Sequence, residues 1–391
     1  MAARHEITRR EFLASAVYAA ALARLQPPSS EARLVGTVPL YLPGRPVPPL
    51  ERLIGSGLDA RLATDLSTLD ASNLVTPNDR YYVRTAAPRG LAAGNLRPPA
   101  DSSVPGTEVA IPIRGRVESP ASVTLADIER AAVKAGPYVM ECAGNADPTN
   151  YGLLSAASWE GARLLALIDR VKAASGSYRI LVNGLDDPGP AQSSVPGASW
   201  IFSRDQLERA ILAVRMNGAP LPRDHGFPVR LIVPGWYGCA CIKWVDAIEL
   251  VPDDSQPTSQ MWEFARRTHQ NGLPERARDY EPPVIDTAAM PIRIEKWSVA
   301  GRLEYRIVGI IWGGTKPTNA LSIRFRAGDA WTKVDDCPLP KTMDTWTLWT
   351  HTWKPPDPGR YQIVLKVDDP SVRTRRLDLF FYTREVEISE L

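Results

Sequence analysis

One cysteine lies where an apolar run gives way to small residues, in the sequence VMECAGN at residues 139–145. The alanine and glycine after Cys142 allow the backbone to turn tightly and another group to come close. A cysteine at such a junction can be a nucleophile, a metal ligand or a small buried hydrophobic residue. The spacing alone leaves these three roles open.

A second group of chemically capable residues lies further along the chain. His225, Arg230 and Lys243 fall within 19 residues, around two strand-like runs that Pro234-Gly235 separates. Such a cluster suits an anionic group, phosphate above all. The alternative is a solvated face with a hydrogen-bonded histidine. The chain has no Walker A loop and no G-x-G-x-x-G, so nucleotide binding by those routes has no support.

The remaining cysteines do not form a familiar ligand set. Cys239 and Cys241 have only His225 nearby, and the chain has no C-x-x-C pair, which disfavours a zinc site. An iron–sulfur cluster would have to recruit the distant Cys337. A Cys239–Cys241 disulfide is an open alternative, although a Cα separation of ~6.6–7 Å on a strand is at the limit for a bridge. No partner that could orient a Cys–His pair is evident, which disfavours a hydrolase.

Composition limits the classes of protein to consider. The 391 residues exceed one ordinary domain, and 44% of them are hydrophobic. A net charge of +2 gives no nucleic-acid footprint and no polybasic membrane surface. The 36 prolines favour short strands over a helical bundle, and four cysteines are too few for a disulfide scaffold.

The N-terminus resembles an export signal. Residues 8–13 read TRREFL, and an alanine-rich apolar run follows to residue 23. Paired arginines, a short apolar stretch and an A-x-A end are typical of a twin-arginine signal over residues 1–26. The alternative is a basic amphipathic helix of the mature protein. We therefore expect a periplasmic or otherwise exported protein.

The rest of the chain divides into four regions. Residues 27–70 are expected to be a proline-rich arm with one short helix over 51–69. Residues 71–255 mix strand-like runs (109–117, 179–182, 229–233 and 242–251) with helix-like runs (125–134, 162–172 and 204–212). Residues 256–290 are polar and irregular, as in a linker. Residues 291–391 contain strand-like runs at 292–297, 303–311, 321–326, 346–353, 361–367 and 376–386, which predict a β-sandwich.

Several separated motifs together resemble the sulfite oxidase family of molybdenum enzymes. They are TPNDRYYVR at 76–84, CAGN at 142–145, WEGARL at 159–164, the stretches 217–230 and 234–244, and GIIWGG at 309–314. The resemblance implies an α+β fold, in which a mixed α/β molybdopterin-binding domain precedes an immunoglobulin-like dimerisation domain.

The resemblance also implies roles for single residues. Cys142 is expected to bind molybdenum through its thiolate, a soft ligand that suits this metal, and to be catalytic. Arg84 and Tyr237 are the other expected catalytic residues. The expected contacts of the molybdopterin are Tyr82, Arg84, Cys142, Asp187 (or its neighbour Asp186), His225, Arg230, Cys239, Cys241 and Lys243.

Departures from the family pattern fall on the substrate side. Ala146 and Asp147 stand where sulfite-oxidising members have two arginines, and Ala86 replaces a histidine. Pro196 replaces the catalytic tyrosine, for which Tyr237 and Trp200 are candidate substitutes. At ~4 Å and a dielectric of ~20, one charge is worth several kcal/mol. We therefore expect a less anionic substrate than sulfite, such as a sulfoxide.

These observations predict an exported molybdenum-cofactor oxidoreductase that transfers an oxygen atom to or from a small sulfur- or nitrogen-oxide substrate. Outside the leader only His225, His269 and His351 remain, so no haem is expected in this chain. Electrons are expected to pass to or from a separate carrier such as a c-type cytochrome, and the C-terminal domain to form a homodimer. The alternatives are a sulfite dehydrogenase or oxidase and a non-catalytic binding protein of the same family.

Overall fold

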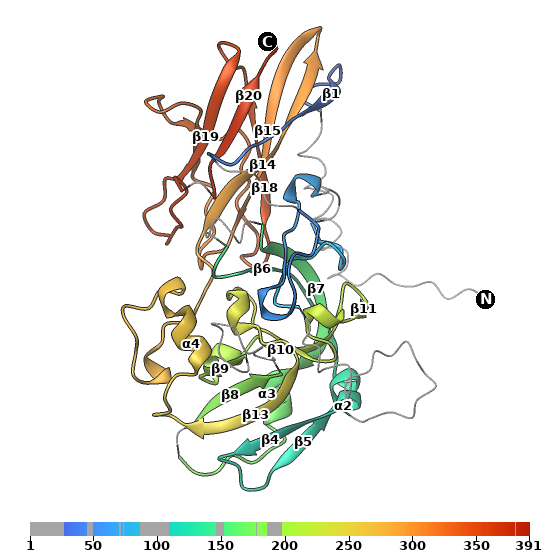
Figure 1. The fold of residues 1–391 in the computed structure, drawn as a ribbon, viewed down its shortest axis with the longest axis vertical. Coiled ribbons are helices and arrows are strands. Elements are labelled where there is room, and N and C mark those ends of the chain that lie inside the picture. The colour runs from blue at the N-terminus through green and yellow to red at the C-terminus, as the bar shows by residue number, and fades with distance from the viewer. Residues whose placement is uncertain are drawn as a thin grey trace, which may run out of the picture. The chain divides into compact units, whose positions relative to one another are not determined.

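The computed structural model describes residues 27–44, 50–69, 72, 74–86, 109–145, 152–176, 178–185, 198–379 and 381–391. These residues form two compact units (Figure 1). The large unit contains the described residues of 48–64 and 75–285, and the terminal unit contains those up to 47, of 65–74 and of 286–391. Strands dominate both units and the described helices are short, so the fold is α+β with a predominance of sheet.

In the first sheet of the large unit, strand β6 ends directly before Cys142. Its strands run in the order β11-β10-β7-β6, and β12 also pairs with β10. All of these pairings are antiparallel. The bounds are β6 Val133–Glu141, β7 Leu154–Arg163, β10 Ile211–Met216, β11 Ala219–Pro220 and β12 Arg230–Ile232. A Cβ on Gly161 of β7 would lie 2.0 Å from the Leu212 carbonyl oxygen, so only glycine allows this close pairing with β10.

The second sheet has the order β5-β4-β13-β8-β9, with β13 and β4 parallel and the other pairs antiparallel. The bounds are β4 Ala110–Gly115, β5 Ala121–Thr124, β8 Tyr178–Gly184, β9 Ser199–Phe202 and β13 Val245–Pro252. Thr124 and Asp127 form a reciprocal capping box that starts α2 (Leu125–Arg130). A two-stranded ladder joins β2 (Arg61–Leu62) to β3 (Val83–Arg84).

Short helical turns complete the large unit. They are α3 (Leu164–Ile168), α4 (Ser259–Phe264), η1 (Gly57–Asp59), η5 (Asp205–Leu207), η6 (Arg223–His225), η7 (Gly238–Ala240), η8 (Ala265–Arg267) and η9 (Ala277–Asp279).

The terminal unit consists of two four-stranded sheets, β1-β14-β15-β18 and β17-β16-β19-β20. The bounds are β1 Arg33–Val38, β14 Ala288–Val299, β15 Arg302–Trp312, β16 Leu321–Arg324, β17 Thr332–Lys333, β18 Thr347–Trp353, β19 Gly359–Val367 and β20 Arg384–Ile388, with η2 at Leu66–Thr68. Trp353 stacks on Phe325 at 4.3 Å and meets Tyr361 edge-on at 4.8 Å, so aromatic packing links the two sheets.

The expected strands were mostly confirmed, whereas two of the four expected helices were not, and the other two are shorter than expected. Residues 51–69 form two single turns and β2, and the run at 204–212 gives only η5 before β10 begins. Helix α2 ends at Arg130, and β6 follows from Val133. Leu207, Ile211 and Leu212 are completely buried, so their apolar pattern reflects burial within the sheet rather than one face of a helix. In the tail, the run at 376–386 becomes a strand only from Arg384.

Two further expectations concern the N-terminus. The expected signal at 1–26 lies outside the described residues. Within the part of the chain that the structure describes, no helix is both long and apolar enough to cross a bilayer. The proline-rich arm contributes β1, which pairs with β14.

Asn217 holds the segment before Tyr81 against β10, and we expect its loss to destabilise the large unit. Its amide donates to the carbonyl oxygen of Thr76 (2.9 Å) and to Asn78 (2.8 Å), and it accepts from the Ser158 amide (2.9 Å). Its φ of +52° is left-handed, which alanine adopts poorly. Asn217→Ala should therefore cost about 2–4 kcal/mol in urea unfolding.

Asn217→Gly is the matched control, because glycine accepts this φ and loses only the side-chain hydrogen bonds. Its cost should be smaller than that of Asn217→Ala by about 1 kcal/mol. Wild-type stability in both variants would contradict this role for Asn217.

Candidate active site

A pocket opens in the large unit, and its empty volume is ≈ 990 Å³ including the solvent at its mouth. Five parts of the chain line it, namely residues 82–85, Cys142, Ala198, residues in the range 224–243, and residues in the range 260–267. Residues from both separated clusters of the sequence therefore meet in one cavity.

Cys142 follows the last residue of β6, and its side chain is buried. The Gly144 amide donates to its sulfur at 3.4 Å. The turn is held by buried Asn145, which donates to Glu141 (3.1 Å) and accepts from the Leu153 amide (3.0 Å). Burial raises the pKa of the Cys142 thiol, while the Gly144 amide, Arg84 and Arg267 oppose that rise. The thiol is therefore protonated in the free protein, and a bound metal cation would favour the thiolate.

Arg230 is a buried cation, only 5% exposed. Its Nη1 donates to the His225 carbonyl oxygen (3.2 Å), its Nη2 contacts the Met140 sulfur (3.0 Å), and its guanidinium lies over the Trp159 ring. Its Nε has no hydrogen-bond partner, and no described carboxylate pairs with it. A buried charge without a counter-ion is costly, so this guanidinium points to an anionic ligand.

His225 lies beside Arg230, at the end of η6. Its Nε2 lies 3.2 Å from the Asn78 carbonyl oxygen, which can only accept, so Nε2 carries the hydrogen. Burial, followed by the charges of Arg230 and Lys243, lowers the pKa of His225 to about 3. The imidazole is therefore neutral at physiological pH, with Nδ1 unprotonated.

Lys243 completes the predicted cluster of His225, Arg230 and Lys243, which we call the trio. Its Nζ donates to the backbone carbonyl oxygens of Asp224 (3.0 Å), Arg84 (3.4 Å) and Thr85. Gly226, with φ +108°, allows the close packing, since a Cβ there would lie 3.1 Å from the Cβ atoms of Arg230 and Lys243. The structure thus places the trio together, with Lys243 joining it to the segment that carries Arg84.

Tyr82, Cys239 and Cys241 also line the pocket, as predicted from the motifs. A Cβ on Gly238 would lie 2.6 Å from the Tyr82 hydroxyl, so glycine leaves space at the wall. Cys239 lies within the 3₁₀ turn η7 and Cys241 directly follows that turn, rather than both lying on a strand. Both cysteines are free, so the structure does not contain the alternative Cys239–Cys241 disulfide. Burial raises the pKa of both thiols.

Tyr237, which we expected to be catalytic, does not line the pocket. Its side chain is fully buried, with its ring centroid 6.3 Å from that of His269, and it is not among the pocket-lining residues. Its amide donates to the Pro283 carbonyl oxygen at 2.9 Å, which turns this part of the chain inward. Trp200 is likewise buried, in β9. Asp186, Asp187, Ala146, Asp147 and Pro196 lie outside the described residues.

The wall that residues 258–267 form was not predicted from the sequence. Gln260, Glu263, Phe264 and Arg267 line the pocket, although they lie in the segment expected to be a linker. Thr258 caps α4 by accepting from the Met261 amide (3.2 Å), and its hydroxyl donates to the Ser199 carbonyl oxygen (2.7 Å). A threonine cap before buried Met261 and Ala265, four residues apart, was the available signal.

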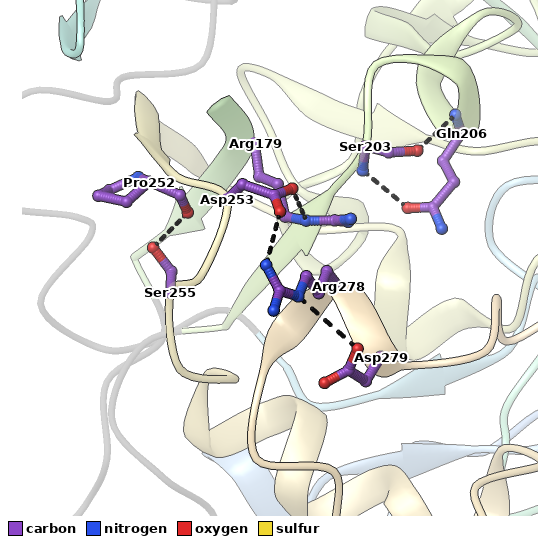
Figure 2. Close-up of polar contacts among 8 residues, drawn as sticks. All are labelled: Arg179, Ser203, Gln206, Pro252, Asp253, Ser255, Arg278 and Asp279. Carbon is purple, nitrogen blue, oxygen red and sulfur yellow. Dashed lines mark hydrogen bonds and ion pairs between the residues drawn. The ribbon is translucent and has the colours of Figure 1, made fainter. Parts of the chain in front are cut away.

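An ion-pair cluster fixes the start of the same segment to the second sheet. Figure 2 shows Asp253, after β13, between Arg179 of β8 and Arg278 of η9, at 3.0 and 3.1 Å. The Arg278 hydrogen bond and then the charge of Arg179 lower the pKa of Asp253 against the effect of burial. Residues 253–279 are therefore part of the large unit.

The four cations of the pocket act on two different groups. Arg230 and Lys243 are the charges that lower the pKa of His225, whereas Arg84 and Arg267 are those that lower the pKa of Cys142. We call these the trio end and the thiol end of the pocket. One end suits a buried anion, and the other combines a soft sulfur ligand with cations.

We expect the stability of the cofactor-free protein to depend on His225 at acid pH. Because the folded pKa (about 3) is below the ordinary 6.5, the unfolded chain binds a proton first. Stability should fall as pH drops from about 6.5 towards 3, by up to about 1.4 kcal/mol per pH unit from this group. Urea unfolding at several pH values measures the slope, and His225→Gln should reduce it. An NMR titration midpoint near 6.5 for His225 would contradict this assignment.

The comparisons with known proteins agree with this site. The family model described as oxidoreductase molybdopterin binding domain matches residues 101–259. The chain is 26% identical over 343 residues to sulfite oxidase of Gallus gallus, which covers 77% of this chain and 68% of the relative. It is 31% identical over 185 residues to mitochondrial sulfite oxidase of Homo sapiens, over 42% of this chain and 33% of the relative.

A third relative is the NADH nitrate reductase of Ulva prolifera, 24% identical over 77% of this chain and 38% of the relative. The chain thus spans about one third to two thirds of the length of these three relatives. The fold resembles the crystal structure of the sulfane dehydrogenase SoxCD from Paracoccus pantotrophus, with a TM-score of 0.57, 18% identity, and coverage of 95% of this chain and 98% of that chain. The motifs, the pocket and these similarities agree: residues 101–259 of the chain match the molybdopterin binding domain of oxidoreductases, and the chain is similar to sulfite oxidases and to a nitrate reductase.

Proposed function

We propose that this protein is an exported molybdenum-cofactor enzyme that transfers one oxygen atom and two electrons on a small sulfur- or nitrogen-oxide substrate. The observation that carries the proposal is the pairing, in one pocket, of buried Arg230 with its unpartnered Nε and the buried thiol of Cys142. The first suits the phosphate of a molybdopterin, and the second suits its metal.

The residues of the pocket fit this cofactor. His225, Arg230 and Lys243 would hold the phosphate and polar ring edges, beside Tyr82, Cys239 and Cys241. When bound, the cofactor would supply a metal that changes oxidation state by two units as an oxygen atom is transferred. Gly144 and Arg84 would favour the charged form of Cys142 once its proton has left, because both already oppose the rise of its pKa.

The two ends of the pocket would have different tasks. Lys243 donates to the carbonyl oxygens of Arg84 and Thr85, so the segment that carries this arginine is held in place before any ligand binds. Preorganised donors need little rearrangement as charge develops during the reaction. Arg84 would then orient the oxygen atoms of the substrate near Cys142.

The remaining parts of the proposal rest on the sequence. Arg9 and Arg10 in the leader support export. We further propose that the two sheets of the terminal unit form an immunoglobulin-like dimerisation domain, and that a separate carrier such as a c-type cytochrome exchanges the electrons. SoxCD, which this chain resembles in fold, is a sulfane dehydrogenase.

Sulfite oxidation is the second candidate, and Arg84 together with Arg267 favours it. Both cations lie near the Cys142 sulfur and could attract an anion, which compensates for the alanine and aspartate at positions 146 and 147. The similarity to two sulfite oxidases supports the same candidate.

The cofactor assignment predicts about one molybdenum per chain in the purified protein. Cys142→Ser should lose activity, because a hydroxyl is a poor replacement for a soft thiolate. Arg230→Met, which keeps an unbranched apolar side chain but removes the guanidinium and its charge, should lower molybdenum content by about tenfold or more. Elemental analysis measures both. A folded wild-type protein without molybdenum, produced in a host that makes the cofactor, would contradict the proposal.

Turnover on neutral sulfoxides and on the anions sulfite and nitrate separates the candidates. If the absence of arginines at positions 146 and 147 decides the substrate preference, dimethyl sulfoxide should give a kcat/KM at least about tenfold above that of sulfite. A higher kcat/KM for sulfite would instead favour the second candidate.

A further inference from the structure

Residues 258–267 form a rigid wall that faces the reactive end of the pocket. Besides the Thr258 cap, Gln260 Nε2 donates to the Cys239 carbonyl oxygen, and Met261 and Ala265 are fully buried. Thr268 follows directly, and its hydroxyl donates to the Phe264 carbonyl oxygen at 2.8 Å. The side chains of this wall therefore project from a backbone that is anchored on both sides.

Arg267 is the last residue of η8, and its guanidinium lies 5.9 Å from the centre of the Phe264 ring. Both side chains line the pocket. Arg267 is exposed and makes no salt bridge with any residue that the structure describes. Its positive charge lowers the pKa of Cys142, as does that of Arg84, which lies much earlier in the chain. This cation is thus available to a ligand at the thiol end.

We propose that Arg267 is a substrate-binding residue that, with Arg84, draws a singly charged oxyanion to the thiol end of the pocket, and that Glu263 limits the charge accepted. The proposal rests on the proposed function, because it assumes that the reaction takes place at Cys142.

Glu263 is the residue that should make the thiol end prefer a singly charged anion. It lies four residues before Arg267, lines the same pocket, and its charge acts on Arg84. Arg84, Arg267 and Glu263, the charged lining residues that we assign to the thiol end, carry a net charge of +1. Glu141 also acts on the Cys142 sulfur, but it is buried, accepts from Asn145 and does not line the pocket. A bound monoanion would neutralise this net charge, whereas a dianion would leave one negative charge that the Glu263 carboxylate repels.

The charge at the thiol end can be measured without knowing the substrate. Iodoacetate and iodoacetamide alkylate the same thiolate and are similar in size, but only the first is an anion. The ratio of their rates at Cys142 therefore reports the local potential and is independent of the thiolate fraction. The full-length chain is made in a host that cannot synthesise the cofactor, and peptide mass spectrometry, with Cys142→Ser as reference, assigns the modified site.

Arg267→Gln should lower the iodoacetate-to-iodoacetamide ratio about three- to tenfold, and Glu263→Gln should raise it about two- to threefold. Arg266→Gln is the matched control, because Arg266 is an exposed arginine one residue away that does not line the pocket. Its ratio should stay within about 1.5-fold of wild type. Equal effects of Arg266→Gln and Arg267→Gln, or no effect of Arg267→Gln, would overturn the proposal.

A second readout uses the molybdenum-loaded protein and inert anions. Calorimetry should show that Arg267→Gln weakens perchlorate binding about tenfold, that Glu263→Gln strengthens sulfate binding, and that neither changes the molybdenum content. Loss of molybdenum in Arg267→Gln would assign the residue to the cofactor and overturn the proposal. If wild type contains no molybdenum, the proposed function fails, and the alkylation ratio alone decides whether Arg267 attracts anions.

Discussion

The buried charge of Arg230 is the constraint on which the site depends. The guanidinium lies below the surface with a carbonyl oxygen, a thioether and an indole ring around it, and one nitrogen without a partner. Such an arrangement stabilises the folded protein poorly by itself. It becomes favourable when an anion arrives, so the protein gives up stability at this point in exchange for a preformed binding site.

The surroundings of Arg230 keep the trio end ready for that anion. His225 is neutral because burial and two neighbouring cations disfavour its protonation and lower its pKa, so it adds a polar group without a third positive charge. Lys243 satisfies its ammonium on backbone carbonyl oxygens and thereby ties η6 to the β3 segment. Gly226 is what permits this packing, because any side chain there would press against both Arg230 and Lys243.

The parts of the site that short motifs encode could be predicted from the sequence. The pocket is lined by Tyr82, Arg84, Cys142, His225, Arg230, Cys239, Cys241 and Lys243, and each belongs to a motif whose resemblance to the sulfite oxidase family implied its role. Arg267 could not be predicted, because its role arises from how α4 packs beside β9, a tertiary contact with only the Thr258 cap as a local sign. The buried position of Tyr237 could not be predicted for the same reason, since its amide donates to the carbonyl oxygen of Pro283, which lies 46 residues further along the chain. In the fold, fully buried runs such as that of β10 were ambiguous between helix and strand, whereas the alternating strands of the tail were not.

The buried state of the cysteines has a consequence for the life of the protein before it acquires its cofactor. Burial raises the pKa of all four thiols, so in the empty protein they remain protonated. Exchange with small oxidised thiols needs the anionic form and physical access. Cys142, Cys239 and Cys241 are also buried, so in the unloaded chain their exchange with such thiols should be slow, and Cys142 should stay available for a metal that binds late.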